Sequence, residues 1–95
     1  MIEFKNRQLH VSGEINFANA ETVYLNGLRM IQQQDTFPVT VNLSALQSPN
    51  TLALAVVIRW LRQTPDVKGL VLKAVPEKMT KIIQSCHLEN DLQII

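Results

Sequence analysis

The sequence predicts a single α/β domain, in which helices pack on a mixed, mainly parallel sheet. Short segments rich in β-branched residues alternate with longer segments of helical periodicity, and turn-forming residues separate them. The chain has 95 residues, of which 46% are apolar, and a chain of this size can bury one hydrophobic core. We therefore expect residues 1–95 to form one domain without a linker or repeat.

The first part of the chain is expected to form a β-hairpin. Residues 2–4 and 8–12 are short alternating segments of the kind that form strands. The polar pair Asn6-Arg7 lies between them and favours a tight turn. Gly13 then ends the second strand.

A helix is expected after this hairpin. Asn16 or Asn19 could cap it, because an asparagine side chain accepts hydrogen bonds from the free amides of a first turn. The apolar residues between positions 17 and 33 recur at a spacing that lines one side of a helix. They are Phe17, Ala20, Tyr24, Leu28 and Ile31.

The middle of the chain predicts a strand, a helix and another strand. The strand contains Val39, Val41 and Leu43, in a pattern that suits a sheet. The helix is expected over 51–62, and Pro65 marks its end. Residues 70–72 form the next strand, led in by Lys68 and Gly69.

A third helix is expected between Pro76 and His87, since proline is well accommodated in a first helical turn. Residues 92–95 could add a last edge strand. Cys86 is the only cysteine, so no internal disulfide can form. Its spacing from Met79 and Ile82 places it on one helix face, which predicts a buried structural thiol.

Charge and hydropathy exclude several classes of protein. Nine basic and eight acidic residues give a net charge of +1, so nothing indicates the basic face of a nucleic-acid-binding protein. No apolar run is long enough to cross a bilayer, and the first residues lack the layout of a signal peptide. We expect a cytoplasmic protein that binds no nucleic acid and does not span a membrane.

The helix expected over 51–62 is apolar on more sides than one core requires. Successive residues advance by about 100 degrees around a helix, so two apolar stripes arise. Leu54, Val57, Ile58 and Leu61 form the stripe expected to face the sheet, and Leu52, Val56 and Trp60 form the other, flanked by Arg59. Exposed apolar clusters ringed by polar groups usually mark interfaces. We therefore predict that this second stripe contacts a partner, the alternative being burial against another helix of the same domain.

Three polar residues stand where the strand gives way to this helix. Ser48 and Asn50 are expected to act as helix caps, and Thr51 follows them. The run Asn42-Leu43-Ser44, six further residues and then Thr51 before Leu-Ala-Leu resembles the signature of STAS domains, named for sulphate transporters and anti-sigma factor antagonists. The segment 12–15 is similar to the turn that enters the first helix of that family. The resemblance covers essentially the whole chain.

The resemblance implies a STAS fold and a binding function. Thr51 matches the position at which the family accepts a phosphate, whereas Asn42 and Asn50 stand where the family carries acids. We therefore do not predict that Thr51 is phosphorylated. The residues expected at a partner interface are Thr51, Leu52, Val56, Arg59 and Trp60.

Among small STAS proteins, the chain is most similar to the cytoplasmic STAS subunit of the Mla lipid-asymmetry ABC transporter. That resemblance implies a non-catalytic subunit that binds the ATPase beneath the inner membrane, in a complex whose permease and substrate-binding subunits handle the phospholipid. An anti-sigma factor antagonist regulated by phosphorylation of a serine or threonine is the alternative.

Enzymatic function has no support in the sequence. His10 and His87 are far apart without a carboxylate at ligand spacing, so neither a metal site nor an acid–base pair is indicated. The glycines form no phosphate-binding loop, and Ser44 and Ser48 lack a paired base. We expect no cofactor. A small-ligand sensor would need a pocket of convergent polar groups, which the sequence does not reveal.

Overall fold

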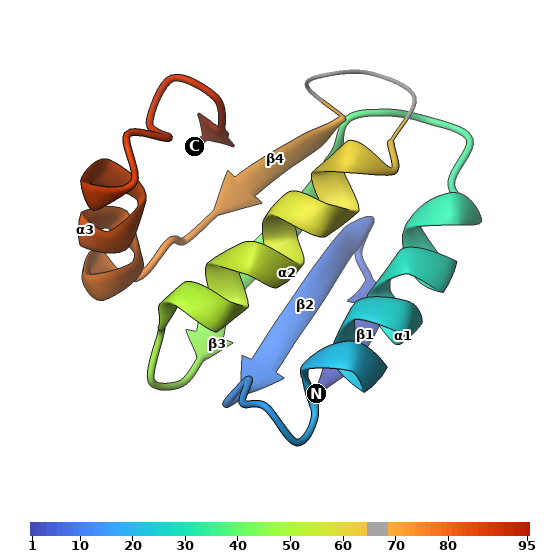
Figure 1. Ribbon diagram of the computed structural model, residues 1–95. Coiled ribbons are helices and arrows are strands. Elements are labelled where there is room, and N and C mark those ends of the chain that lie inside the picture. The colour runs from blue at the N-terminus through green and yellow to red at the C-terminus, as the bar shows by residue number, and fades with distance from the viewer. Residues whose placement is uncertain (65–68) are drawn as a thin grey trace.

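Helices and strands follow one another in the predicted order (Figure 1). The computed structural model describes residues 1–64 and 69–95. The elements are β1 (Ile2–Lys5), β2 (Gln8–Gly13), α1 (Ala20–Gln32), β3 (Val39–Leu46), α2 (Thr51–Arg62), β4 (Leu70–Lys73), α3 (Glu77–Ser85) and β5 (Gln93–Ile94). Pro65, expected to mark the end of the second helix, and Lys68, expected to lead into the strand after it, lie outside the described residues.

The sheet is mixed and mainly parallel, as predicted. Its strand order is β1-β2-β3-β4-β5; the first pair is antiparallel and the other three pairs are parallel. Each parallel connection steps in the same direction, and such crossovers are right-handed, so the helices are expected on one face of the sheet. Figure 1 shows α1 and α2 lying across one face and α3 beyond β4.

The β1–β2 hairpin turns at the predicted pair. Asn6 and Arg7 have φ values of 55° and 61°. Two successive left-handed residues give the turn whose twist matches that of the flanking strands. Gly13, which ends β2, has a φ of 78°, a conformation that a residue without a Cβ adopts readily.

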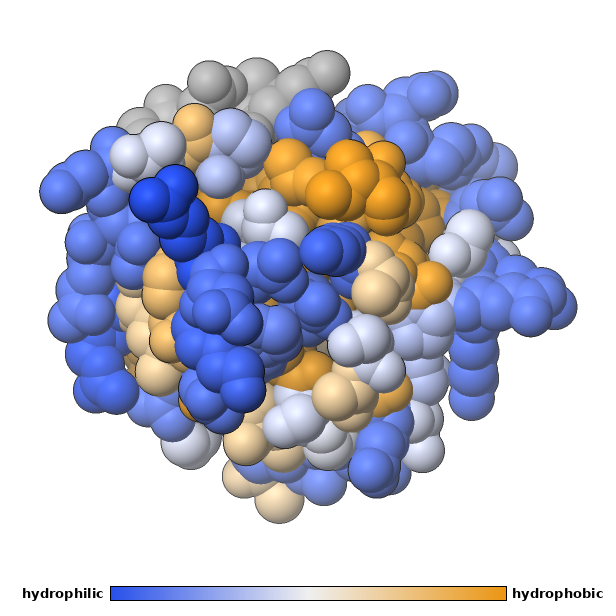
Figure 2. All heavy atoms as spheres, turned by 180° about the vertical axis from the view of Figure 1, so that it is seen from behind, coloured by the Kyte–Doolittle hydropathy of each residue, from blue (hydrophilic) through white to orange (hydrophobic). Residues whose placement is uncertain are grey.

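Alternation along the strands separates the two faces of the sheet. Leu9 and Val11 of β2 are buried under the helices with Val41 and Leu43 of β3. The residues between them face the opposite side, where the Asn42 amide donates to the Gln8 side chain at 3.0 Å. Figure 2 shows this side: hydrophilic side chains cover most of it, with an apolar area toward β4 and β5. The core therefore lies between one sheet face and the helices.

The prediction of a buried Cys86 is wrong, because its side chain is exposed. Met79 and Ile83 are buried as the periodicity indicates, but α3 ends at Ser85. Cys86 only caps that helix, its backbone amide donating to the carbonyls of Ile82 and Gln84. The helix therefore ends before Cys86, and the periodicity of α3 does not place this side chain on the buried face. Among the helices of residues 1–64 and 69–95, none has the length and hydrophobicity of a membrane-spanning segment.

Candidate partner-binding site

Two loops meet at the carboxyl ends of β2 and β3. Residues 14–19 connect β2 to α1, and residues 47–50 connect β3 to α2. The backbone amide of Gln47 donates to the carbonyl of Gly13 at 2.8 Å, which holds the loops side by side. In open α/β sheets this edge is where binding sites usually lie.

Asn50 is confirmed as the cap of α2. Its Oδ1 accepts a hydrogen bond from the amide of Ala53 at 2.8 Å, and its Nδ2 donates to the carbonyl of Ile15 at 3.0 Å. One side chain therefore both starts the helix and ties it to the neighbouring loop. The expectation that Ser48 also caps is wrong: it lies in a left-handed turn with a φ of 48°, and its carbonyl accepts from Asn50 instead.

The predicted partner-binding residues divide into accessible and buried ones. Thr51, the first residue of α2, is exposed, Leu52 is half-buried and Arg59 is exposed. They lie on adjoining sides of one helix, so the structure presents these three to solvent together.

Trp60 and Val56 are buried, Trp60 against α1, which corrects the prediction of an exposed stripe. Trp60 is 0% exposed and Val56 is 2% exposed. The indole Nε1 of Trp60 donates to the carbonyl of Tyr24 at 2.9 Å, and the ring lies against Gly27. A glycine at this point lets α1 approach closely enough to cover the ring. Burial within the domain, the alternative given above, is therefore correct for these two residues.

Arg59 joins α2 to α1 on the solvent side of this contact. Its Nη1 lies 3.0 Å from Oε2 of Glu21, and its guanidinium carbon lies 3.7 Å from the centre of the Tyr24 ring. The hydrogen bond lowers the pKa of the Glu21 carboxyl below its ordinary value. The same bond raises the pKa of Arg59. The pair stays charged near neutral pH, so Arg59 is held in place.

Phe17 is the residue that sequence periodicity misplaced. The helical spacing assigned it to the buried side of α1, yet it is 95% exposed. It lies in the loop before α1, at the edge where the two loops meet. Asn19, the second of the two expected caps, carries the sequence signal that could have located it, because a helix that begins after Asn19 leaves Phe17 in the loop.

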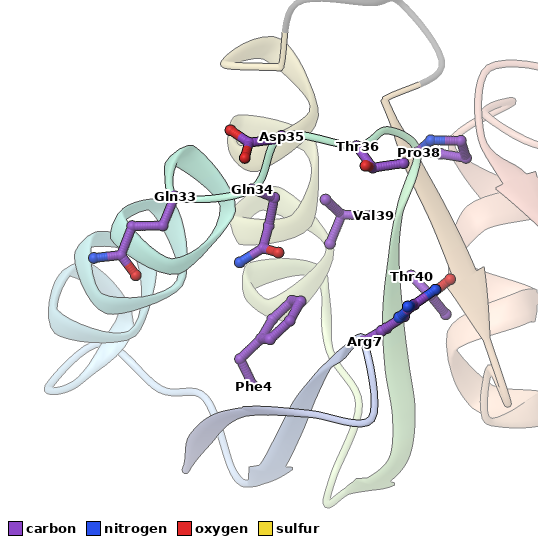
Figure 3. A pocket seen from close by; sticks show the side chains of 9 residues that line it. All are labelled: Phe4, Arg7, Gln33, Gln34, Asp35, Thr36, Pro38, Val39 and Thr40. Atoms are coloured by element: carbon purple, nitrogen blue, oxygen red, sulfur yellow. The ribbon is translucent and has the colours of Figure 1, made fainter.

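A cavity of about 530 Å³ lies at the other end of the sheet (Figure 3). Figure 3 shows Gln34 directed toward Phe4, while Gln33 and Asp35 point away. The polar side chains do not converge, and the Gln34 amide already donates to the carbonyl of Met30 at 3.1 Å. Within residues 1–64 and 69–95, no group of three or more histidine, cysteine, aspartate or glutamate side chains could hold a metal ion.

Comparisons with known proteins agree with this geometry. Residues 2–94 match the family described as "Mlab, STAS domain". No curated protein is significantly similar to the chain. A chain of the Acinetobacter MlaFEDB complex in the ATP-bound Vtrans1 conformation is 53% identical, with a TM-score of 0.93 and 100% of both chains covered. In the Vtrans2 conformation the values are 53% and 0.94, covering 100% of this chain and 99% of that one. The resemblance noted in the sequence is thereby confirmed, and the chain belongs to the MlaB STAS domain family.

Proposed function

We propose that this chain is the STAS subunit of an ABC transporter for phospholipid trafficking, which maintains the lipid asymmetry of the outer membrane. In this role it binds the ATPase subunit and supports its assembly and activity. The observation that carries the proposal is the 53% identity, over the whole chain, to chains of the Acinetobacter MlaFEDB complex. Identity at that level includes surface as well as core residues, and it favours the same kind of assembly.

The proposed role is non-catalytic and cytoplasmic. ATP hydrolysis belongs to the ATPase subunit, and the permease and substrate-binding subunits handle the phospholipid. The chain is held beneath the inner membrane through its partner and contributes a binding surface.

The surface proposed for the ATPase is the accessible part of α2 and the loop before it. Thr51 and Leu52 lie at the start of α2, and Arg59 lies two turns further along. Trp60 and Val56 support this surface from the core, and the contact of Trp60 with α1 fixes where α2 lies. Their role in binding is thus indirect.

The anti-sigma antagonist alternative is not favoured. It would require Thr51 to accept a phosphate beside acidic residues, and asparagines occupy those positions. Both asparagine side chains accept hydrogen bonds from backbone amides: Asn42 Oδ1 from the amide of Ser44 at 2.9 Å, and Asn50 Oδ1 from the amide of Ala53 as the cap of α2.

Co-expression with the ABC ATPase of the same transporter, followed by size-exclusion chromatography, tests the proposal. Wild type should co-elute with the ATPase, and Leu52→Glu should not. A glutamate in the first turn of a helix is favoured by the helix dipole, so this variant should remain folded. Ile95→Glu, on an exposed residue next to the edge strand β5, is the matched control and should co-elute.

Circular dichroism of each variant separates loss of binding from loss of fold. Absence of co-elution with wild type would overturn the proposed function. Co-elution of the folded Leu52→Glu variant would instead leave the function in place and remove α2 from the interface.

A further inference from the structure

Phe17 is the most exposed large apolar side chain in the part of the chain that the structure describes, at 95%. A single exposed apolar residue is ordinary in a soluble protein and by itself indicates nothing. Phe17 differs because the backbone that carries it is fixed by side-chain hydrogen bonds and because it adjoins the surface proposed for the ATPase.

Asn16 and Asn19 close the turn that holds Phe17. Asn16 Oδ1 accepts from the amides of Ala18 at 2.9 Å and Asn19 at 3.1 Å, and the amide of Asn16 donates back to Asn19 Oδ1 at 2.9 Å. These bonds have the reciprocal pattern of a capping box, here around the single turn that precedes α1, whose N-cap position is Asn19. The Asn19 Nδ2 also donates to the carbonyl of Glu14 at 2.9 Å. Phe17 is therefore displayed from an ordered helical turn.

The turn runs directly into the first turn of α1. The amide of Ala20 donates to the carbonyl of Asn16 at 2.9 Å, which is a helical bond. Phe17 lies four residues before Glu21, in the turn that leads into α1. Glu21 is the residue that pairs with Arg59 of α2. The turn that carries Phe17 therefore adjoins the helix end at which Glu21 of α1 contacts Arg59 of α2.

Asn50 connects this turn to the start of α2. Its Nδ2 donates to the carbonyl of Ile15, directly before the capping box, while its Oδ1 caps the helix that begins with Thr51. Phe17, Thr51 and Leu52 are consequently held on one framework.

We propose that Phe17 is a preformed anchor that inserts into an apolar recess of the ATPase subunit. The inference rests on the proposed function and adds a residue to its interface. An aromatic ring buries a large area and has few torsions to restrict, which is why such residues dominate binding energy. Because the capping box orders the backbone beforehand, little conformational entropy is lost when the ring is buried.

Isothermal titration of the purified chain with the ATPase subunit tests the anchor. Phe17→Ser should weaken binding by roughly tenfold or more, the loss typical of an anchor residue. Its thermal unfolding midpoint should match that of wild type, since the ring contributes almost nothing to the core. Ile95→Ser removes another exposed apolar side chain, away from this surface, and should leave the affinity unchanged.

Asn16→Ala provides a second readout, because it keeps the ring and removes the acceptor that orders its turn. The affinity should fall, but by less than with Phe17→Ser. If wild type and Phe17→Ser bind the ATPase equally, the anchor is overturned and the proposed function stands. If wild type does not bind, both fail. A wild-type dimer that Phe17→Ser dissociates, with unchanged ATPase affinity, would overturn the ATPase as the occupant and assign a second copy.

Discussion

Two aromatic side chains at opposite ends of the α1–α2 pair differ in exposure: the Trp60 ring is buried, and the Phe17 ring, in the turn before α1, is almost fully exposed to solvent. Trp60 is 0% exposed and Phe17 is 95% exposed. Trp60 fills the space that Gly27 leaves and satisfies its indole N–H on Tyr24. Phe17 has no such cover, although its own turn is well ordered.

The contrast shows that a ring's role depends on what lies opposite it. A glycine on the facing helix lets that helix approach closely and bury an apolar side chain, as Gly27 does for Trp60. A capped turn at a loop edge leaves an equally apolar ring free for a partner, as at Phe17. Substitutions at Trp60 should therefore change the stability of the domain, and substitutions at Phe17 should change its affinity for a partner.

The largest effect is expected from Trp60→Ala. Removing a fully buried tryptophan should lower the free energy of unfolding by about 3–5 kcal/mol. Urea denaturation monitored by circular dichroism measures it. Trp60→Phe, which keeps a ring but loses the hydrogen bond to the carbonyl of Tyr24, should be destabilised less. A stable Trp60→Ala protein that had lost only ATPase binding would contradict burial and restore the exposed stripe.

Gly27→Ala should come next. Alanine ordinarily stabilises a helix relative to glycine by about 1 kcal/mol. Here the added Cβ would collide with the Trp60 ring, and overpacking of this kind costs about 1–3 kcal/mol. The same denaturation experiment should therefore show a net loss of stability.

The double variant Gly27→Ala/Trp60→Ala tests whether the loss of stability in Gly27→Ala comes from the collision with the Trp60 ring. In a Trp60→Ala background the ring is absent, so Gly27→Ala should become neutral or stabilising. Equal effects in both backgrounds would mean that the two residues do not touch.

The smallest effect is expected from the pair of Glu21 and Arg59, which lies at the boundary between the two ends. Both side chains are substantially exposed to solvent, and such pairs contribute little to stability. Because the folded-state pKa of Glu21 is lowered, its contribution is present above the unfolded pKa and is lost as the pH falls through the folded value. Carboxyl NMR titration should find the pKa of Glu21 below its ordinary value, and Arg59→Gln should return it there. An unchanged titration in that variant would show that Arg59 is not the cause.

The strands and the bounds of α2 could be predicted because their signals are local. Val39, Val41 and Leu43 alternate with polar residues, and all three are buried as that pattern indicates. The helix expected over 51–62 has those bounds, and Asn50 caps it. Each of these depends only on neighbours in the sequence.

The burial of Trp60 and the exposure of Phe17 could not be read from local pattern. A helical wheel of α2 shows where apolar residues point but not which element covers them. Gly27 decides that question, and it lies in another helix. The periodicity predicted the burial of Tyr24 and Ile31 correctly, but it extended the helix back to Phe17. In the structure α1 begins at Ala20, so Phe17 lies in the turn before it and is exposed.

The strand order β1-β2-β3-β4-β5 has a consequence for how the chain is made. Each strand pairs with the strand synthesised just before it, and none has to insert between two that are already paired. A sheet whose order follows the chain keeps the sequence separation of paired strands shorter than a sheet in which later strands insert between earlier ones, and a lower contact order favours faster folding. A chain that emerges N-terminus first can extend its sheet one strand at a time. The domain can thereby complete its own core before any partner arrives.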